Sequence, residues 1–181
     1  MNINSAIQAA MRGDRKSQQY IYEKYARMLM SVCRRYNLSG IQPVDILQDS
    51  FIEIFKHLEK YDPAKGKFEN WITTITIRTA IKVARKNNKH TSLEIDQVFN
   101  LPITEESALD KMSADELMEI IDCIPAGYKE IFNLYVIDGY SHKEIGELLD
   151  MKESTSRSKL MRARDMIGKQ ILINNQKLRA I

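Results

Sequence analysis

Basic side chains are concentrated between residues 153 and 169, in a pattern suited to binding the phosphates and base edges of DNA. Five basic residues stand there against two acidic ones: Arg157, Lys159, Arg162, Arg164 and Lys169 against Glu153 and Asp165. Four further residues recur at the helical spacing i, i+4, i+7 and i+11, namely Ser156, Leu160, Ala163 and Ile167. They predict one buried face, which leaves the basic residues where a DNA groove could receive them. We therefore favour DNA binding over the alternative, an ordinary solvated amphipathic helix.

The residues just before this segment predict a shorter helix and a tight turn. Ser141 followed three residues later by Glu144 is the sequence of a capping box, which marks a helix start. An apolar stripe follows in residues 145–149, and residues 150–152 have the length of a helix-turn-helix connector. The sequence therefore predicts a helix-turn-helix whose second helix is the basic one.

A second basic surface is predicted between Asn70 and Thr91, where no acidic residue occurs. A stripe at helical spacing is formed by Arg78, Lys82, Arg85 and Lys89. The preceding loop, residues 65–71, mixes lysines with Phe68 and Trp71, as surfaces that bind single-stranded nucleic acid do. The alternative, that Phe68 and Trp71 are core residues at a helix start, stays open.

An acidic and apolar helix is predicted at residues 45–55. Its polar edge carries Asp45, Gln48, Asp49 and Glu53, beside Leu47, Phe51 and Phe55. Such a helix would repel DNA, so we expect it to dock a protein.

The composition predicts an all-α fold, because the 181 residues include only 7 Gly and 4 Pro and few alternating apolar runs. A first small helical domain is expected at 1–90, with helices near 4–11, 14–36, 43–58 and 68–87. Residues 91–112 carry five acidic residues against one lysine and predict an acidic flexible linker. Residues 113–181 predict a four-helix domain that includes the helix-turn-helix, opens with a capping box at Ser113 and ends in a frayed tail from 174.

Other classes of protein are disfavoured. No apolar stretch is long enough to span a membrane, and the N-terminus lacks the apolar core of a secretory leader. Cys33 and Cys123 are far apart and predict buried free thiols in a reducing cytoplasm. No His/Cys spacing predicts a metal site, and no phosphate loop or Ser/His/Asp arrangement predicts an enzyme. We therefore expect no cofactor and no small-molecule substrate.

Three segments resemble one family in the same order. GDRKSQQYIYEKYARML at 13–29 and the stretch from VDILQDSF to RTAI at 44–81 resemble the second conserved region of the extracytoplasmic-function (ECF) sigma factors of bacterial RNA polymerase. The stretch from IPAGYKE to RDMI at 124–167 resembles their fourth region. The resemblance implies a cytoplasmic specificity subunit that binds core RNA polymerase and promoter DNA, with an anti-sigma factor as a candidate partner.

The resemblance also implies roles for individual residues. Docking to the polymerase clamp would fall to Asp45, Leu47, Gln48, Asp49, Phe51 and Phe55. Contacts with the −10 element would fall to Lys65, Lys67, Phe68, Asn70, Trp71, Arg78, Lys82 and Arg85. Readout of the −35 element would fall to Arg157, Ser158, Met161 and Arg162, with Thr155, Lys159 and Arg164 near phosphates. The linker would resemble the segment that threads toward the RNA exit path.

Three departures from the family pattern stand out. Thr74 and Ile75 occupy the positions of the tryptophan pair with which housekeeping sigma factors open the duplex. Met161 replaces a frequent aromatic residue, and Gly146 replaces the usual alanine, which predicts a cost of about 1 kcal/mol in helix stability. The alternative function is a stand-alone helix-turn-helix regulator, which would need neither the second basic surface nor the acidic helix.

Overall fold

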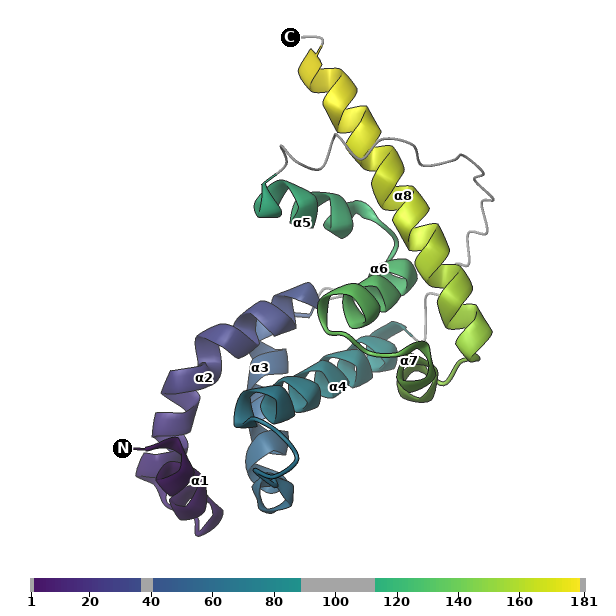
Figure 1. Cartoon of the computed structure of the whole chain (residues 1–181). Coiled ribbons are helices and arrows are strands. Elements are labelled where there is room, and N and C mark those ends of the chain that lie inside the picture. The colour runs from purple at the N-terminus through teal and green to yellow at the C-terminus, as the bar shows by residue number, and fades with distance from the viewer. Residues whose placement is uncertain (1, 37–40, 89–112, 180–181) are drawn as a thin grey trace. The chain divides into compact units, whose positions relative to one another are not determined.

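The computed structural model describes residues 2–36, 41–88 and 113–179 (Figure 1). All regular structure in these ranges is helical, which confirms the all-α prediction for this part of the chain. The chain divides into two compact units, residues 1–93 and 94–181. The predicted linker at 91–112 lies outside the described residues.

The described residues of the first unit form four α-helices and one 3-10 turn. They are α1 (Ile3–Met11), α2 (Arg15–Arg35), α3 (Pro43–Lys56), η1 (Leu58–Lys60) and α4 (Phe68–Asn88). The Asp14 carboxylate caps α2 by accepting the Ser17 backbone N–H at 2.9 Å, and Pro43 occupies the first position of α3. The predicted boundaries hold to within one or two residues, because caps and prolines mark them in the sequence.

Helices α2, α3 and α4 pack against one another, and α1 packs on α2. The core of this unit is made of aliphatic side chains that are almost fully buried: Ile21, Leu29, Ile46, Ile54, Ile72 and Ile77. It also encloses three residues that the sequence had assigned to binding surfaces, namely Leu47, Phe51 and Phe68.

In the second unit, residues 113–179 form four α-helices and a π-helical segment. They are α5 (Ala114–Cys123), α6 (Ala126–Phe132), η3 (Asn133–Ile137), α7 (His142–Leu149) and α8 (Glu153–Arg179). Both predicted capping boxes are present, Ser113 with Glu116 and Ser141 with Glu144. The predicted frayed tail is wrong, because α8 continues to Arg179.

Helix α8 packs against α5, α6 and α7 (Figure 1). Ile120, Ile121 and Ile124 meet the inner face of α8, where Ala163 and Ile167 are buried. Ser156 and Leu160 are buried on the same face. The inward face predicted for α8 is therefore confirmed.

Gly146 lies where the turn of the helix-turn-helix folds back on α7. Asp150 ends α7 in the left-handed conformation with φ of 49°, and the Met151 N–H donates to the Gly146 carbonyl at 3.0 Å. A Cβ on Gly146 would lie 2.8 Å from the Met151 carbonyl oxygen. The prediction that Gly146 only lowers helix stability was incomplete, because the absence of a Cβ also lets the Met151 backbone lie close to α7.

The two cysteines differ in exposure. Cys33 is buried, and burial raises the pKa of its thiol to about 11. Cys123 is exposed near the end of α5, so the prediction that it is buried was wrong. Among the described residues no helix is long and apolar enough to cross a membrane.

Candidate nucleic-acid interface

The outer face of α8 carries most of the residues predicted to read DNA. Arg157, Ser158 and Arg162 are exposed, and Met161 has 69% of its surface exposed. Because only three residues separate the end of α7 from the start of α8, the turn fixes which face of α8 packs against α7 and which face is free. The four residues assigned to base readout therefore share one accessible surface.

The residues predicted to contact phosphates differ in their exposure. Arg164 is exposed, whereas Thr155 and Lys159 are half-buried. The Lys159 ammonium lies over the start of α6, 3.8 Å from where a Cβ on Gly127 would stand.

Arg157 is held by an ion pair with Glu153, one helical turn earlier. Both side chains are largely exposed, so this pair contributes at most about 1 kcal/mol. Such a pair can be exchanged for contacts with DNA at little cost.

An aromatic cluster lies at the start of α4 in the first unit. The ring of Tyr61 lies 5.0 Å from that of Phe68 and 5.6 Å from that of Trp71, and Phe68 and Trp71 are stacked at 5.8 Å. Phe68 is only 4% exposed, so its proposed contact with a base is corrected: it supports Trp71 from within the core. Trp71 is half-buried and keeps an open side.

Tyr61 was missed as a member of this cluster. The sequence places it in a breaker-rich turn, which gives no sign of its orientation. Its hydroxyl donates to the Gly66 carbonyl at 3.1 Å, which ties the ring across the loop that carries the lysines. The only feature of the sequence that could have predicted this role is the position of Tyr61, at the other end of the loop that carries Lys65 and Lys67.

The polar residues of the same loop are accessible. Lys65, Lys67 and Asn70 are exposed. Glu69 accepts a hydrogen bond from the Tyr25 hydroxyl at 2.9 Å. Backbone and Tyr25 hydrogen bonds lower the pKa of Glu69, while burial raises the pKa of Tyr25, so both groups keep the protonation states that this bond needs.

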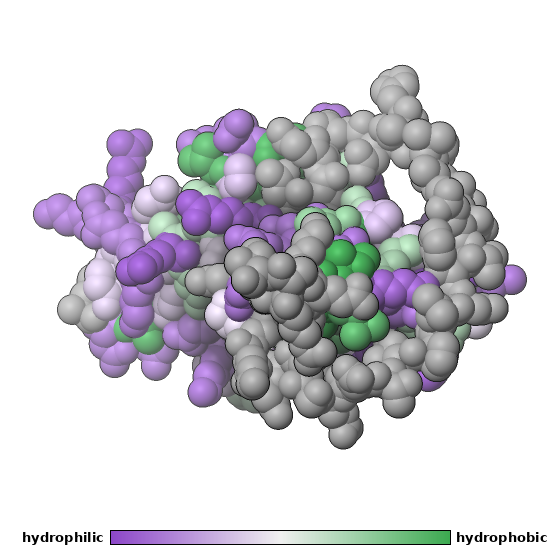
Figure 2. Space-filling model, turned by 90° about the horizontal axis from the view of Figure 1, so that it is seen from above, coloured by the Kyte–Doolittle hydropathy of each residue, from purple (hydrophilic) through white to green (hydrophobic). Residues whose placement is uncertain are grey.

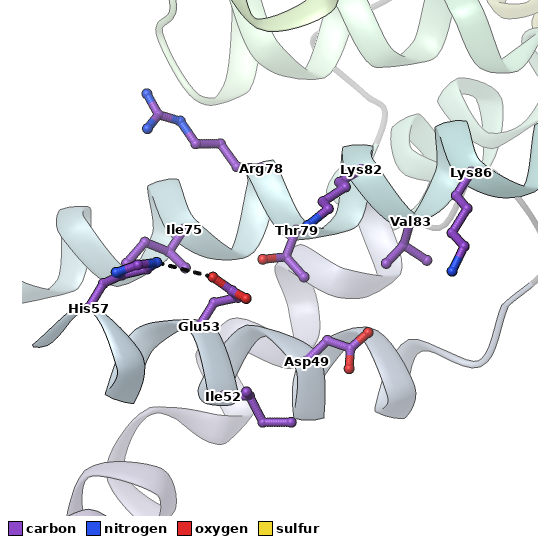
Figure 3. A pocket seen from close by; sticks show the side chains of 10 residues that line it. All are labelled: Asp49, Ile52, Glu53, His57, Ile75, Arg78, Thr79, Lys82, Val83 and Lys86. Atoms are coloured by element: carbon purple, nitrogen blue, oxygen red, sulfur yellow. Dashed lines mark ion pairs between the residues drawn. The ribbon is translucent and has the colours of Figure 1, made fainter.

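An open groove of about 470 Å³ runs along the exposed side of the junction between α3 and α4 (Figure 3). One wall carries Lys82 and Lys86, and the other carries Asp49 and Glu53. Glu53 pairs with His57 at 3.3 Å. Opposite charges therefore face each other across the groove.

The basic stripe of α4 is only partly as predicted. Arg78, Lys82 and Arg85 are all exposed. Arg78 lines the groove but extends away from α3, and Lys86 rather than Arg85 lines the groove next to Lys82. Lys89 lies outside the described residues.

The exposed face of α3 differs from the predicted docking surface. Leu47 and Phe51 are 2% and 4% exposed, so their assignment to direct polymerase contact is corrected. Phe51 packs against Tyr22 at 4.7 Å and against the half-buried Phe55 at 5.9 Å. Direct contact with a partner is open to other side chains of this helix.

Among the exposed side chains of α3, four share one face: Asp45, Gln48, Asp49 and Ile52. The three polar residues are exposed, and Ile52 is 62% exposed. The spacing i, i+3, i+4 and i+7 from Asp45 puts Ile52 on this face. Helical spacing alone would therefore have predicted Ile52 on the polar edge of α3. The docking prediction instead used Leu47, Phe51 and Phe55, which lie on the opposite face.

Hydrophilic side chains dominate the coloured surface in Figure 2, with only small hydrophobic patches between them. Ile52 is the most exposed of the valine, leucine and isoleucine side chains among the described residues, at 62%. It is the apolar member of what we call the α3 face: Asp45, Gln48, Asp49 and Ile52.

Each of the two units matches a known protein-family model. Residues 21–90 match the family model Sigma-70 region 2, and residues 114–167 match Sigma-70, region 4. The ECF RNA polymerase sigma-E factor of Escherichia coli K12 is 25% identical over 177 residues, covering 91% of this chain and 92% of the relative. The ECF RNA polymerase sigma factor SigE of Mycolicibacterium smegmatis is 28% identical over 139 residues, covering 73% of this chain and 53% of the relative.

Two solved structures share the fold. One is the sigma factor RpoE in complex with the anti-sigma factor NepR from Bartonella quintana, with a TM-score of 0.53, 15% identity, and coverage of 85% of this chain and 95% of that one. The other is CnrH in complex with the cytosolic domain of CnrY, with a TM-score of 0.50, 16% identity, and coverage of 92% and 94%. The two matched regions, in this order, and the similarity to the ECF relatives show that the chain belongs to the ECF sigma factors, the non-enzymatic initiation subunits that bind core RNA polymerase and DNA.

Proposed function

We propose that the two units divide the work of promoter selection. The first unit docks to core RNA polymerase and contacts the −10 element, and the second reads the −35 element. The observation that carries this proposal is the separation of charge within the first unit. The α3 face is acidic and apolar, which suits a protein, while the exposed side of α4 is cationic, which suits DNA.

The −35 element would be read from the outer face of α8. Arg157 and Arg162 can each donate two hydrogen bonds to a guanine, which contributes about 1–3 kcal/mol of discrimination. Ser158 and Met161 would contact neighbouring bases. Thr155, Lys159 and Arg164 would contact phosphates.

The −10 element would be held by the loop before α4 and by α4 itself. Trp71, backed by Phe68 and Tyr61, offers a platform for an unstacked base, and such stacking contributes about 1–3 kcal/mol. Lys65, Lys67 and Asn70 surround it. The melted strand would then follow Arg78, Lys82 and Arg85 along the exposed side of α4.

The polymerase clamp would be docked by the α3 face. Its two carboxylates suit a cationic partner, and Ile52 supplies apolar area that becomes buried in the complex. Leu47, Phe51 and Phe55 contribute by packing from behind.

We also infer that residues 91–112 join the two domains, 1–90 and 113–181, as an acidic connector. Twenty-two residues span at most roughly 70 Å when extended. The complex of the related RpoE with NepR makes an anti-sigma factor a candidate partner of this chain as well.

The test is to mix the purified chain with core RNA polymerase, measure co-elution, and then transcribe a promoter library in run-off reactions. Stable binding, with transcription from a subset of promoters, is the expected result. Failure to bind core polymerase, with DNA bound by the chain alone, would favour the stand-alone regulator instead.

A further inference from the structure

His142 is buried within the helix-turn-helix, although none of the proposed DNA contacts uses it. It is the first residue of α7 and only 8% exposed. Its Nδ1 lies 2.9 Å from the hydroxyl of Ser156, a fully buried residue in the first turn of α8. The imidazole thus joins the start of α7 to the start of the recognition helix.

The same imidazole is stacked on Tyr135. The two ring centroids are 4.3 Å apart, and the ring planes differ by 21°. Tyr135 belongs to the π-helical segment η3, and π-helical turns are rare and frequently occur at functional sites. The guanidinium of Arg164 lies over the Tyr135 ring, 6.0 Å from its centroid, within reach of a cation–π interaction.

These four residues form a chain of contacts that begins and ends on α8. We call Ser156, His142, Tyr135 and Arg164 the His142 relay. Ser156 and Arg164 are eight residues apart, or about 12 Å along a helix. The residues proposed to read bases, 157–162, lie between these two attachment points.

We propose that His142 is a positioning residue for −35 recognition, which holds α8 through Ser156 at one end of its reading segment and through Tyr135 and Arg164 at the other. Two attachments fix both the rotation and the tilt of α8. A bidentate contact between arginine and guanine depends on such orientation. The inference rests on the proposed function, namely that α8 reads the −35 element.

The surroundings of His142 make the His142 relay sensitive to pH. Burial lowers the pKa of the imidazole, and the cations Arg157 and Arg164 on α8 lower it further, while Glu153 acts in the opposite direction. Tyr135 contributes a neutral ring from η3. The relay therefore holds a neutral imidazole near pH 7. Protonation would add a third positive charge beside two arginines and favour an outward movement of the ring.

The experiment uses holoenzyme reconstituted from core RNA polymerase and the full chain. The probes are the promoter duplex selected from a randomised library by the wild-type holoenzyme and the same duplex with its −35 element scrambled. His142→Phe keeps the ring stack but loses Nδ1, and Ser156→Ala removes the other partner of the hydrogen bond. His142→Asn keeps an amide near the position of Nδ1 but removes the titrating group. His57→Asn, in the first unit, is the control.

We expect His142→Phe and Ser156→Ala to reduce the preference for the selected duplex about three- to tenfold at pH 7.5 while leaving binding to the scrambled duplex unchanged. In the wild type and in His57→Asn, the preference falls as the pH is lowered from 7.5 to below the ordinary imidazole pKa of 6.5, and in His142→Asn that fall is lost. The pH profile of the wild type needs no variant, so it tests the inference even if a variant folds poorly.

Two results would overturn the inference. One is an unchanged preference in both relay variants. The other is an equal loss of binding to the selected and scrambled duplexes, which would mean general damage to the domain. A wild-type holoenzyme with no −35 preference at any pH would instead overturn the proposed function of α8, and the inference with it.

Discussion

Gly146→Ala should change the stability of the helix-turn-helix in two opposite ways, through helix propensity and through steric crowding. In a helix interior, alanine is more stable than glycine by about 1 kcal/mol. Here the added methyl group would lie 2.8 Å from the Met151 carbonyl oxygen. Unstrained contacts between carbon and a carbonyl oxygen are about 3.3–3.6 Å long, so the turn must open by roughly 0.5 Å.

The steric effect should win. Overpacking of this kind costs about 1–3 kcal/mol, and the turn cannot move freely because the Met151 N–H donates to the Gly146 carbonyl. We therefore expect Gly146→Ala to destabilise the second unit by about 1 kcal/mol. For a domain of 60–100 residues this corresponds to a fall of about 4–8 °C in Tm.

Gly127→Ala is the matched control, because the same methyl group added there meets only the flexible end of Lys159, at 3.8 Å. It should be neutral or raise the stability by up to about 1 kcal/mol. Differential scanning calorimetry of the full chain measures both variants against the wild type. If Gly146→Ala raises the Tm as much as Gly127→Ala does, the close approach of the turn to α7 is not a constraint and the reasoning fails.

Three further predictions concern the α3 face, α8 and the acid stability of the second unit. Ile52→Glu should weaken co-elution with core polymerase at nearly unchanged stability, because the side chain is exposed, whereas Phe51→Ala should cost about 3–5 kcal/mol of unfolding free energy in denaturant titrations. Arg162→Ala should lose about 1–3 kcal/mol of discrimination at a single −35 base pair, as measured with a series of single-substitution duplexes. His142 has a pKa below its ordinary 6.5 when folded, so the unfolded state binds the proton more readily and stability falls as the pH drops below about 6.5. Urea titrations should show a slope that approaches at most about 1.4 kcal/mol per pH unit and that is reduced in His142→Asn.

Each of these predictions has a result that contradicts it. Normal polymerase binding by Ile52→Glu would remove the α3 face as a docking surface. A uniform loss of affinity across all duplexes in Arg162→Ala would indicate a phosphate contact rather than a base contact. Equal pH slopes in the wild type and His142→Asn would assign the acid sensitivity to other groups.

The helices of both units could be predicted largely from local signals. Asp14, Pro43, Ser113 and Ser141 mark helix starts by capping chemistry that acts over three or four residues. The inward face of α8 follows from helical periodicity, since one packed side requires apolar or small residues at that spacing. These features depend on neighbours in the sequence and could therefore be read from it.

What could not be predicted depends on contacts between distant residues. Phe68 looked like a platform for a base until Tyr25, 43 residues earlier, was found packed against it at 5.6 Å. The π-helical turn that brings Tyr135 onto His142 leaves no pattern in the sequence. Gly146 was predicted only to weaken its helix. The reason for a glycine there is the close approach of the Met151 carbonyl, which belongs to the following turn.

Under the proposed function, the first unit presents a protein-binding face and a separate DNA-binding face within one small domain. The α3 face carries Asp45 and Asp49, and the exposed side of α4 carries Arg78 and Lys82. At physiological salt the field of an exposed charge decays over about 8 Å, so each helix acts mainly on what touches it. A DNA strand that slid from α4 toward α3 would leave two cations and meet two carboxylates, and it would lose attraction at both steps. The groove between the helices therefore marks the boundary beyond which bound DNA should not pass, and neutralising Asp49 should widen the DNA footprint across it.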